Sequence, residues 1–395
     1  MNEPNPFEPP RRRTDGFVYL IYLPFAALAI GLVGWLYEWD FKKVIPDVKD
    51  TAKETATLNE TYGPLLDRLK MKPLTAETLK SEKVVASLRD LQSAPCDKTA
   101  IFRLNEALLE ANAKRPAADA LLGFAGSCPN SEGELYGAGR VLFNLGDYAA
   151  ALPVFDKLVT DRPETAQYYY TRGQIHAFLA NHKSAIEDYT SAIGLADNLA
   201  SVNDQAFSDL AKAYSAAGRN CEAMTAIQTF VYVDAAGRDK ARARRLIADY
   251  AAKGRCDDGY AKGKETIRKI NRDVVITKAA INGVTGMFVI DTGASLVSID
   301  SKFADKVKLA ADDNRKVRMH TANGAAEAAL VTAKTVKLGS VQANNVAVAI
   351  IEKPIGAGVD GLLGMSFLAR FDVTINETGI TIASRTVTAE TGAGK

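Results

Sequence analysis

The sequence predicts a multidomain protein with an N-terminal transmembrane helix, an all-α repeat array and a C-terminal all-β domain. Three observations predict this architecture: an apolar run over 17–39, a 34-residue period in the middle of the chain, and strand-like alternation after Arg255. The chain has 395 residues, of which 47% are apolar and 24% charged. That composition suits two or three packed domains and excludes wholesale disorder.

Charge and the metal-ligating residue types exclude two classes of function. Lys and Arg number 49 against 47 Asp and Glu, a net charge of +2, so we expect no concentrated basic surface and no nucleic-acid partner. The three histidines and four cysteines lack the short spacings of a zinc site. The sequence therefore predicts a protein without a metal or another cofactor.

The run FVYLIYLPFAALAIGLVGWLYEW at 17–39 is the predicted membrane anchor. Its 23 residues include one charged side chain, Glu38, and as a helix they would extend about 34 Å, enough for a hydrocarbon core of about 30 Å. Arg11–Arg13 precede the run, so the positive-inside rule places residues 1–16 in the cytoplasm and the rest of the chain on the outer, periplasmic side. A cleaved signal peptide is the alternative, although its apolar core would be shorter, about 7 to 15 residues.

The middle of the chain is predicted to be helical throughout. Residues 40–95 are polar and rich in Lys and Glu with helical spacing, which predicts a stalk or lead-in, and three to four repeats follow over 96–256. The period resembles the tetratricopeptide repeat, whose arrays bind peptides or partner proteins; a plain helical bundle is the alternative. Matching residues 34 apart include Gly139 and Gly173, Leu152 and Ile186, and Phe155 and Tyr189.

Cysteines bracket two of the predicted helix pairs. The two ends of an antiparallel helix pair meet in space. The sequence therefore predicts one disulfide between Cys96 and Cys128 and another between Cys221 and Cys256. Disulfides agree with a location outside the cytoplasm. Four buried free thiols are the alternative.

The C-terminal part of the chain is predicted to be built from hairpins. Asn282-Gly283 joins two predicted strands, 274–281 and 284–290, and is a strong signal for a two-residue hairpin turn. A second hairpin turns at Asn323-Gly324, and two short strands near 371–375 and 380–383 follow. The predicted boundaries are 257–272 for a linker, 273–386 for the β domain and 387–395 for a flexible tail.

Three ordered elements in this domain resemble the retropepsin-like aspartic proteases. They are the strand that runs into Asp291-Thr292-Gly293, the hairpin with TANG at its tip, and Leu362-Leu363-Gly364, which begins 71 residues after Asp291. The GLLGMSFL segment is similar to that of bacterial membrane-anchored members. The resemblance covers about 272–386 and implies a single-lobe, all-β aspartic protease barrel. It implies that Asp291 is catalytic, that Thr292 and Gly293 support its loop, and that Ala322, Asn323 and Gly324 form the tip of a flap over the substrate.

The resemblance also implies how the site is completed. One D-T-G in about 115 residues is half of a two-lobed enzyme, so a homodimer is expected, in which two Asp291 carboxylates share a proton and activate a water. Ser295 and Met365 stand where retroviral enzymes have an Asp–Arg pair, which puts viral-type dimer contacts in doubt. We interpret Asp360 as a turn residue. The implied substrate-pocket residues are Ala294, Ser295, Leu362, Leu363 and Gly364.

The predicted function is that of a membrane-anchored aspartic endopeptidase. Its partners would be a peptide or protein substrate, a second copy through the protease domain, and a protein bound by the repeats. The alternative is a non-catalytic scaffold that holds peptides with the protease-like lobe and the repeats. Release of the lobe by self-cleavage within 257–272 is a further hypothesis, based on the composition of that segment.

Overall fold

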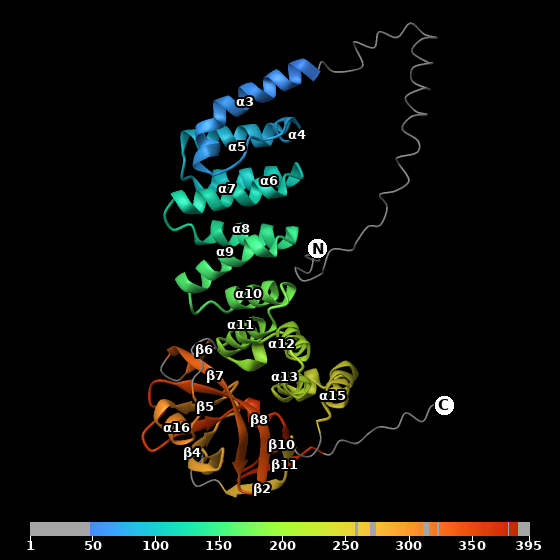
Figure 1. Cartoon of the computed structure of the whole chain (residues 1–395), viewed down its shortest axis with the longest axis vertical. Coiled ribbons are helices and arrows are strands. Elements are labelled where there is room, and N and C mark those ends of the chain that lie inside the picture. The colour runs from blue at the N-terminus through green and yellow to red at the C-terminus, as the bar shows by residue number, and fades with distance from the viewer. Residues whose placement is uncertain are drawn as a thin grey trace, which may run out of the picture. The chain divides into compact units, whose positions relative to one another are not determined.

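The computed structural model (Figure 1) describes residues 48–256, 260–268, 274–310, 316–321, 324–377 and 379–385. The predicted anchor at 17–39, the segment 1–16 before it and the predicted tail 387–395 lie outside these ranges. Within them, no helix has both the length and the apolar character needed to cross a bilayer. The chain divides into two compact units, Met1–Asp67 with Lys72–Asn112, and Arg68–Met71 with Ala113–Lys395.

The first unit contains the predicted helical lead-in. Its core is apolar, with Leu88, Leu91 and Leu104 fully buried. Asp97 begins the last helix of the unit, because its side chain accepts hydrogen bonds from the N–H groups of Thr99 and Ala100. The helices are α3 (Val48–Arg68), α4 (Ala76–Leu79), α5 (Glu82–Ser93) and α6 (Lys98–Glu110).

The helical part of the second unit follows the 34-residue period. A Cβ added at Gly139 would lie 2.7 Å from the Phe155 ring, and one added at Gly173 would lie 2.9 Å from the Tyr189 ring. The period therefore repeats one contact, a glycine under an aromatic ring, which lets paired helices approach closely. The helices are α7 (Lys114–Ser127), α8 (Glu132–Leu145), α9 (Tyr148–Asp161), α10 (Ala166–Phe178), α11 (His182–Gly194), η1 (Leu199–Ser201), α12 (Asp204–Ala216), α13 (Asn220–Tyr232), α14 (Ala235–Arg238) and α15 (Ala241–Gly254).

Two sheets form the β domain. The larger has eight strands in the order β1-β8-β5-β9-β4-β3-β7-β6, with β7 also paired to β8, and the smaller has the order β10-β11-β2. The strands are β1 (Ala261–Lys262), β2 (Lys264–Arg268), β3 (Ile276–Ile281), β4 (Val284–Ile290), β5 (Val297–Asp300), β6 (Lys316–Thr321), β7 (Gly324–Leu338), β8 (Val341–Ile351), β9 (Gly361–Leu363), β10 (Phe371–Ile375) and β11 (Gly379–Ser384). Two short helices, α16 (Ser301–Lys306) and α17 (Met365–Leu368), cover the larger sheet.

The segment predicted as a linker, 257–272, contains two strands, so that prediction is wrong for 261–268. β1 pairs with β8, and β2 pairs with β11 in a register that puts Ile267 opposite Ile380. In β2 exposed and half-buried residues alternate, as in a strand with one covered face. The sequence does not predict β2 as a strand, because Ile267 is the one large apolar residue among Lys, Glu, Thr and Arg.

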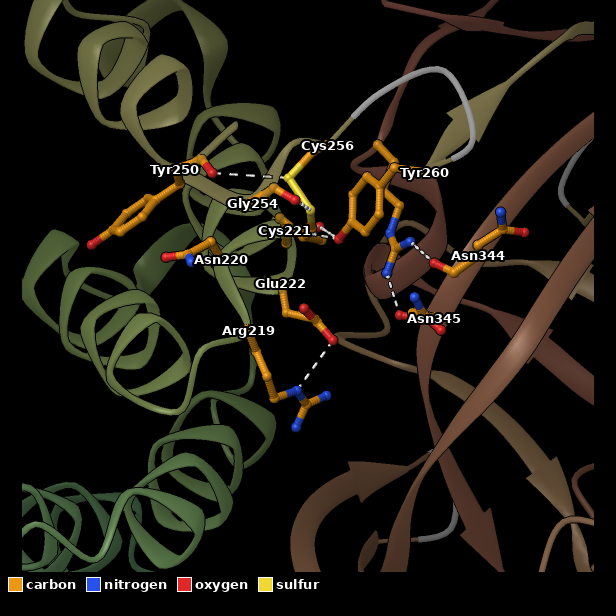
Figure 2. Close-up of a disulfide and its surroundings, with 12 residues drawn as sticks. Arg219, Asn220, Cys221, Glu222, Tyr250, Gly254, Cys256, Tyr260, Asn344 and Asn345 are labelled. Atoms are coloured by element: carbon orange, nitrogen blue, oxygen red, sulfur yellow. Dashed lines mark hydrogen bonds and ion pairs between the residues drawn. A yellow bond between two sulfur atoms is a disulfide. The ribbon is translucent and has the colours of Figure 1, made fainter. Parts of the chain in front are cut away.

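The β domain is fastened to the end of the repeat array around Tyr260 (Figure 2). The buried Tyr260 hydroxyl donates to the carbonyl of Cys221, 2.7 Å away, and also contacts the hydroxyl of Thr225. Behind its ring lies the buried guanidinium of Arg370, 4.0 Å from the ring centroid. This guanidinium donates to the carbonyl of Asn345 at 2.9 Å. Array and β domain are thus joined by packed side chains as well as by the chain itself.

The disulfide between Cys221 and Cys256 lies at the same junction (Figure 2). It ties the first turn of α13 to the residue at which the chain leaves α15, and it is the pairing that the bracketed helix pair predicts. Cys96 and Cys128 are likewise not free thiols. The alternative of four free cysteines does not hold for this structure.

Candidate active site

Strand β4 brings Asp291 to its position. β4 pairs with β3 on one side and, in parallel, with β9 on the other, where Ile290 lies opposite Leu363. One residue further, the N–H of Asp291 donates to the carbonyl of Leu363 at 3.1 Å. The fully buried Leu363 therefore fixes the point at which the strand ends and the D-T-G loop begins.

The loop then turns back on the Asp291 carboxylate. Its Oδ1 accepts hydrogen bonds from the N–H of Gly293, 2.9 Å away, and from the N–H of Ala294, 3.2 Å away. Two amide donors on one oxygen set the plane of the carboxyl group. The carboxylate is only partly buried, so it is both oriented and reachable.

The segment after Leu363 supports this loop from behind. The N–H of Met365 donates to the Ala294 carbonyl at 2.8 Å, and the N–H of Ser366 donates to the Ser295 carbonyl at 3.1 Å. The Ser366 hydroxyl accepts from the N–H of Val297 at 2.9 Å and donates to Ala347 at 2.7 Å. The sequence does not predict Ser366 as a positioning residue, because a serine within an apolar segment carries no distinguishing pattern.

Asp291 opens into a cleft of about 740 Å³. Three of the predicted pocket residues, Ala294, Ser295 and Leu362, line it together with Gly293. Leu363 and Gly364 are buried behind it, and Thr292 is not among the lining residues. Residues of the hairpin formed by β6 and β7, which the resemblance assigns to the flap, also line the cleft. Gly324 begins β7, whereas Ala322 and Asn323 lie outside the described residues.

This geometry agrees with the comparison with protein families. Residues 277–367 match the family model for aspartyl proteases. Residues 166–199, which span α10 and α11, match the model for the tetratricopeptide repeat. The chain therefore combines a retropepsin-like aspartyl protease domain with tetratricopeptide repeats, as the two resemblances predict.

Individual proteins are similar to parts of this chain. A curated relative, "Uncharacterized protein in cobV 5'region" from a Sinorhizobium species, is 34% identical over 117 residues, 29% of this chain, and the match spans about half (49%) of its length. A retropepsin-like aspartic protease from Rickettsia conorii is 25% identical, over 31% of this chain and 92% of its own, with a TM-score of 0.24. YrrB, described as a tetratricopeptide protein with an unusual peptide-binding site, is 18% identical over 42% of this chain and 82% of its own, with a TM-score of 0.35.

The protease domain shares its cleft with the repeat array, which the sequence did not predict. The end of α11 and the segment after it contribute Ile193, Gly194, Ala196, Asp197 and Leu199 to the lining. Asp197 reaches the flap strand β6, where its Oδ1 lies 3.1 Å from Nδ1 of His320. The same matched repeat thus contributes to the wall of the cleft.

Asp360 lies at the start of β9 and has a structural role. Its Oδ2 accepts from the N–H of Met287 at 2.8 Å, and its own N–H donates to the Met287 carbonyl at 2.8 Å. These bonds fasten the β9 end to β4 on the side away from the D-T-G loop. Among the residues that the structure describes, no group of three or more His, Cys, Asp or Glu is arranged to hold a metal ion.

Proposed function

We propose that this protein is an aspartic endopeptidase that cuts peptide bonds at a site completed by a second copy of the chain. One observation carries the proposal: Asp291 is held by two backbone amides in the lining of a cleft that residues of the β6–β7 hairpin also line, in a domain that matches aspartyl proteases. An oriented, accessible carboxylate facing a peptide-sized cleft is what water activation requires.

The chemistry needs two such carboxylates. At about 3 Å apart they cannot both ionise, so two copies of Asp291 would share one proton and hold one water between them. One carboxylate takes a proton from the water as it attacks the scissile carbonyl, and the other donates a hydrogen bond to the carbonyl oxygen. An extended peptide would lie between the D-T-G loop and the flap hairpin as an added strand, held by main-chain hydrogen bonds.

The proposal includes a membrane anchor. The apolar run at 17–39 has the length and flanking charges of a single span with a cytoplasmic N-terminus. The protease domain would then act on the outer, periplasmic side, where disulfides such as Cys221–Cys256 persist. The tetratricopeptide repeats, a fold that binds peptides and proteins, would recruit substrate or a partner.

The test is peptide hydrolysis by the purified full chain and its Asp291→Asn variant, with and without pepstatin, at acid and neutral pH. We expect the variant to lose on the order of a thousandfold in rate, because the amide cannot take a proton from water. Asp161→Asn is the matched control, since Asp161 is an exposed carboxylate of α9 that pairs with Lys157 and does not line the cleft. Equal rates for Asp291→Asn and the parent would end the catalytic proposal.

A peptide-binding scaffold is the second candidate, since each copy has a single D-T-G. A copy that stays alone would hold peptides in the cleft without cutting them. Fluorescence anisotropy with labelled peptides separates the two functions. The scaffold predicts saturable binding by the parent chain with no product in mass spectra, whereas the enzyme predicts product from the parent and binding without product from Asp291→Asn.

A further inference from the structure

One wall of the cleft is formed by residues of the repeat array and not by the protease domain. Ile193, Ala196 and Leu199 give this wall apolar side chains, and Asp197 adds a carboxylate whose side chain is 94% exposed. All of them lie in or directly after α11, outside the protease domain. The resemblance to retropepsin-like enzymes therefore says nothing about these residues.

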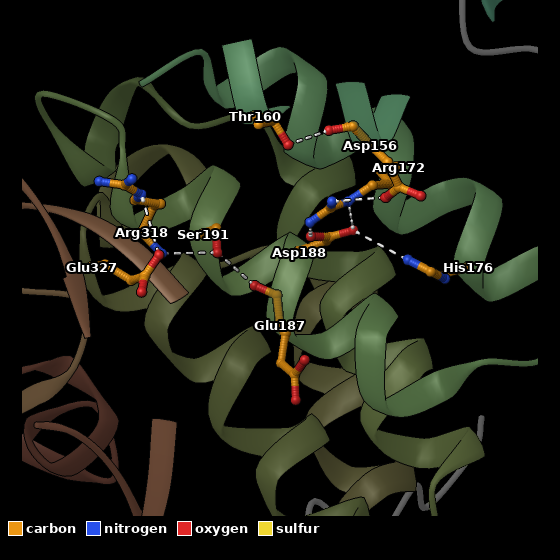
Figure 3. A network of polar contacts seen from close by, with 9 residues as sticks. All are labelled: Asp156, Thr160, Arg172, His176, Glu187, Asp188, Ser191, Arg318 and Glu327. Carbon is orange, nitrogen blue, oxygen red and sulfur yellow. Dashed lines mark hydrogen bonds and ion pairs between the residues drawn. The ribbon is translucent and has the colours of Figure 1, made fainter. Parts of the chain in front are cut away.

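The wall is fixed to the flap strand β6 by contacts with the backbone of that strand. β6 is the last strand of its sheet, and its outer edge meets α11, where the N–H of Arg318 donates to the Ser191 hydroxyl at 3.0 Å (Figure 3). That hydroxyl in turn donates to the Glu187 carbonyl at 2.8 Å. A Cβ at Gly194 would lie 2.9 Å from the Arg318 carbonyl oxygen, so helix and strand are in direct contact.

In the described part of the chain, three carboxylates besides Asp291 line the cleft, Asp197, Glu327 and Glu352, and of these Asp197 alone comes from the repeat array. Glu327, in the flap hairpin, lies 2.8 Å from Lys316 and 4.0 Å from Arg318, so cations from its own hairpin surround it. Asp197 faces the imidazole of His320 and otherwise projects into solvent at the cleft wall. An exposed carboxylate beside apolar side chains suits the long apolar stem and cationic head of Lys or Arg.

We propose that α11 and residues 195–199 form a subsite of the peptide cleft in which Asp197 selects a basic side chain of the substrate. This inference rests on the proposed function, because it takes the cleft to hold an extended peptide. The repeat array would then have two tasks, since it selects the sequence that enters the cleft and also offers its remaining surface to a partner.

The experiment measures peptide binding by the full chain carrying Asp291→Asn, so that cleavage is not needed for the readout. The probes are fluorescein-labelled decapeptides that differ only by Lys or Glu, placed in turn at each position. We expect one position at which Lys binds about threefold to fivefold better than Glu, as for an exposed ion pair, with the preference reduced in 0.5 M salt. Adding Asp197→Lys should reverse the preference, and Asp197→Asn should abolish it.

Asp161→Lys is the matched control, because Asp161 is an exposed carboxylate of α9 that pairs with Lys157 and does not line the cleft. It should leave the Lys preference intact. An unchanged preference in Asp197→Lys, with the same circular dichroism as the parent, overturns the subsite and leaves the proposed enzyme standing. If Asp197→Lys reverses the preference but the chain that retains Asp291 cleaves no peptide, the subsite is supported and the catalytic proposal is overturned. Absence of binding by every peptide overturns both.

Discussion

The loop that carries Asp291 is held from behind by Gly364, which is buried where two carbonyl groups of that loop approach it. A Cβ at this position would lie 2.1 Å from the Leu296 oxygen and 2.8 Å from the Ala294 oxygen. Both atoms belong to the backbone and cannot rotate away. We therefore expect Gly364→Ala to destabilise the protein by about 2 kcal/mol or more, seen as a fall in the unfolding temperature, together with loss of peptide binding.

Gly126→Ala provides the control for this substitution. Gly126 lies within α7 with nothing within 4 Å of an added Cβ, so the methyl group has room. Alanine is the better helix former, and we expect this variant to gain about 0.5 to 1 kcal/mol. If both variants had the unfolding temperature of the parent, the close contact behind the D-T-G loop would be disproved.

Tyr260 connects the stability of the array junction to pH. Burial raises the pKa of Tyr260 to about 12, although Arg370 and the hydrogen bond with Thr225 act in the opposite direction. Because its pKa in the unfolded chain is about 10, the folded protein favours the neutral phenol. Its contribution to the free energy of unfolding is therefore complete below pH 10 and is lost as the pH rises from 10 through 12.

The comparison of the parent with Tyr260→Phe isolates this contribution. At pH 8 the variant lacks the hydroxyl that donates to Cys221, and we expect it to be less stable by about 1 kcal/mol. Between pH 10 and 12 this difference in the free energy of unfolding should shrink. Ionisation of Tyr260 increasingly favours the unfolded chain of the parent, whereas the variant has no ionisable group at this position. Urea unfolding followed by far-ultraviolet circular dichroism measures the free energy of unfolding of the parent and of the variant at each pH. A difference between them that stays constant across this range would contradict the prediction.

Between elements, the contact of α11 with β6 includes one side-chain hydrogen bond to the backbone of the edge strand. Alternate N–H groups of an edge strand point away from its sheet partner, and that of Arg318 is satisfied by the Ser191 hydroxyl. We expect Ser191→Ala to increase hydrogen exchange at the Arg318 amide by about fivefold, the equivalent of about 1 kcal/mol. The neighbouring amides of Val317 and Met319, which face β7, should change less.

Ser215→Ala is the control for the exchange experiment. Ser215 contacts Asn220 at 2.7 Å near the end of α12 and does not touch the flap hairpin. Equal effects of the two variants on the Arg318 amide would show that the exchange reports general loosening of the array. An effect that only Ser191→Ala produces would also establish that the repeat array protects the edge amide of the flap strand β6 from exchange.

The sequence was sufficient to predict those elements whose signal lies in a few contiguous residues. Asn282 and Gly283 have φ angles of 49° and 86°, which is the left-handed pair that an Asn-Gly hairpin turn requires. The D-T-G loop was equally predictable, because its motif is contiguous. The contact of Ser191 with Arg318 joins residues 127 positions apart, and neither belongs to a pattern, so only the folded chain reveals it. The same holds for Asp197 in the cleft wall.

For the whole molecule, the decisive property is whether one chain or two make the active site. Each chain contributes one Asp291, so the proposed water needs two copies related by a two-fold axis. Mixing the parent with Asp291→Asn under conditions of subunit exchange produces heterodimers with one carboxylate and one amide. Such heterodimers should be inactive, because the amide cannot share the proton.

The rate then depends on the square of the parent fraction. With equal amounts of parent and variant at constant total protein, about one quarter of the dimers carry two aspartates, so the rate should fall to about one quarter of that of the parent alone. A site contained in one chain would give about one half. Dilution of the parent alone provides an independent measurement, because dissociation into single copies lowers the rate per subunit. A rate that follows the parent fraction linearly, and that dilution leaves unchanged, would require a complete active site within a single chain.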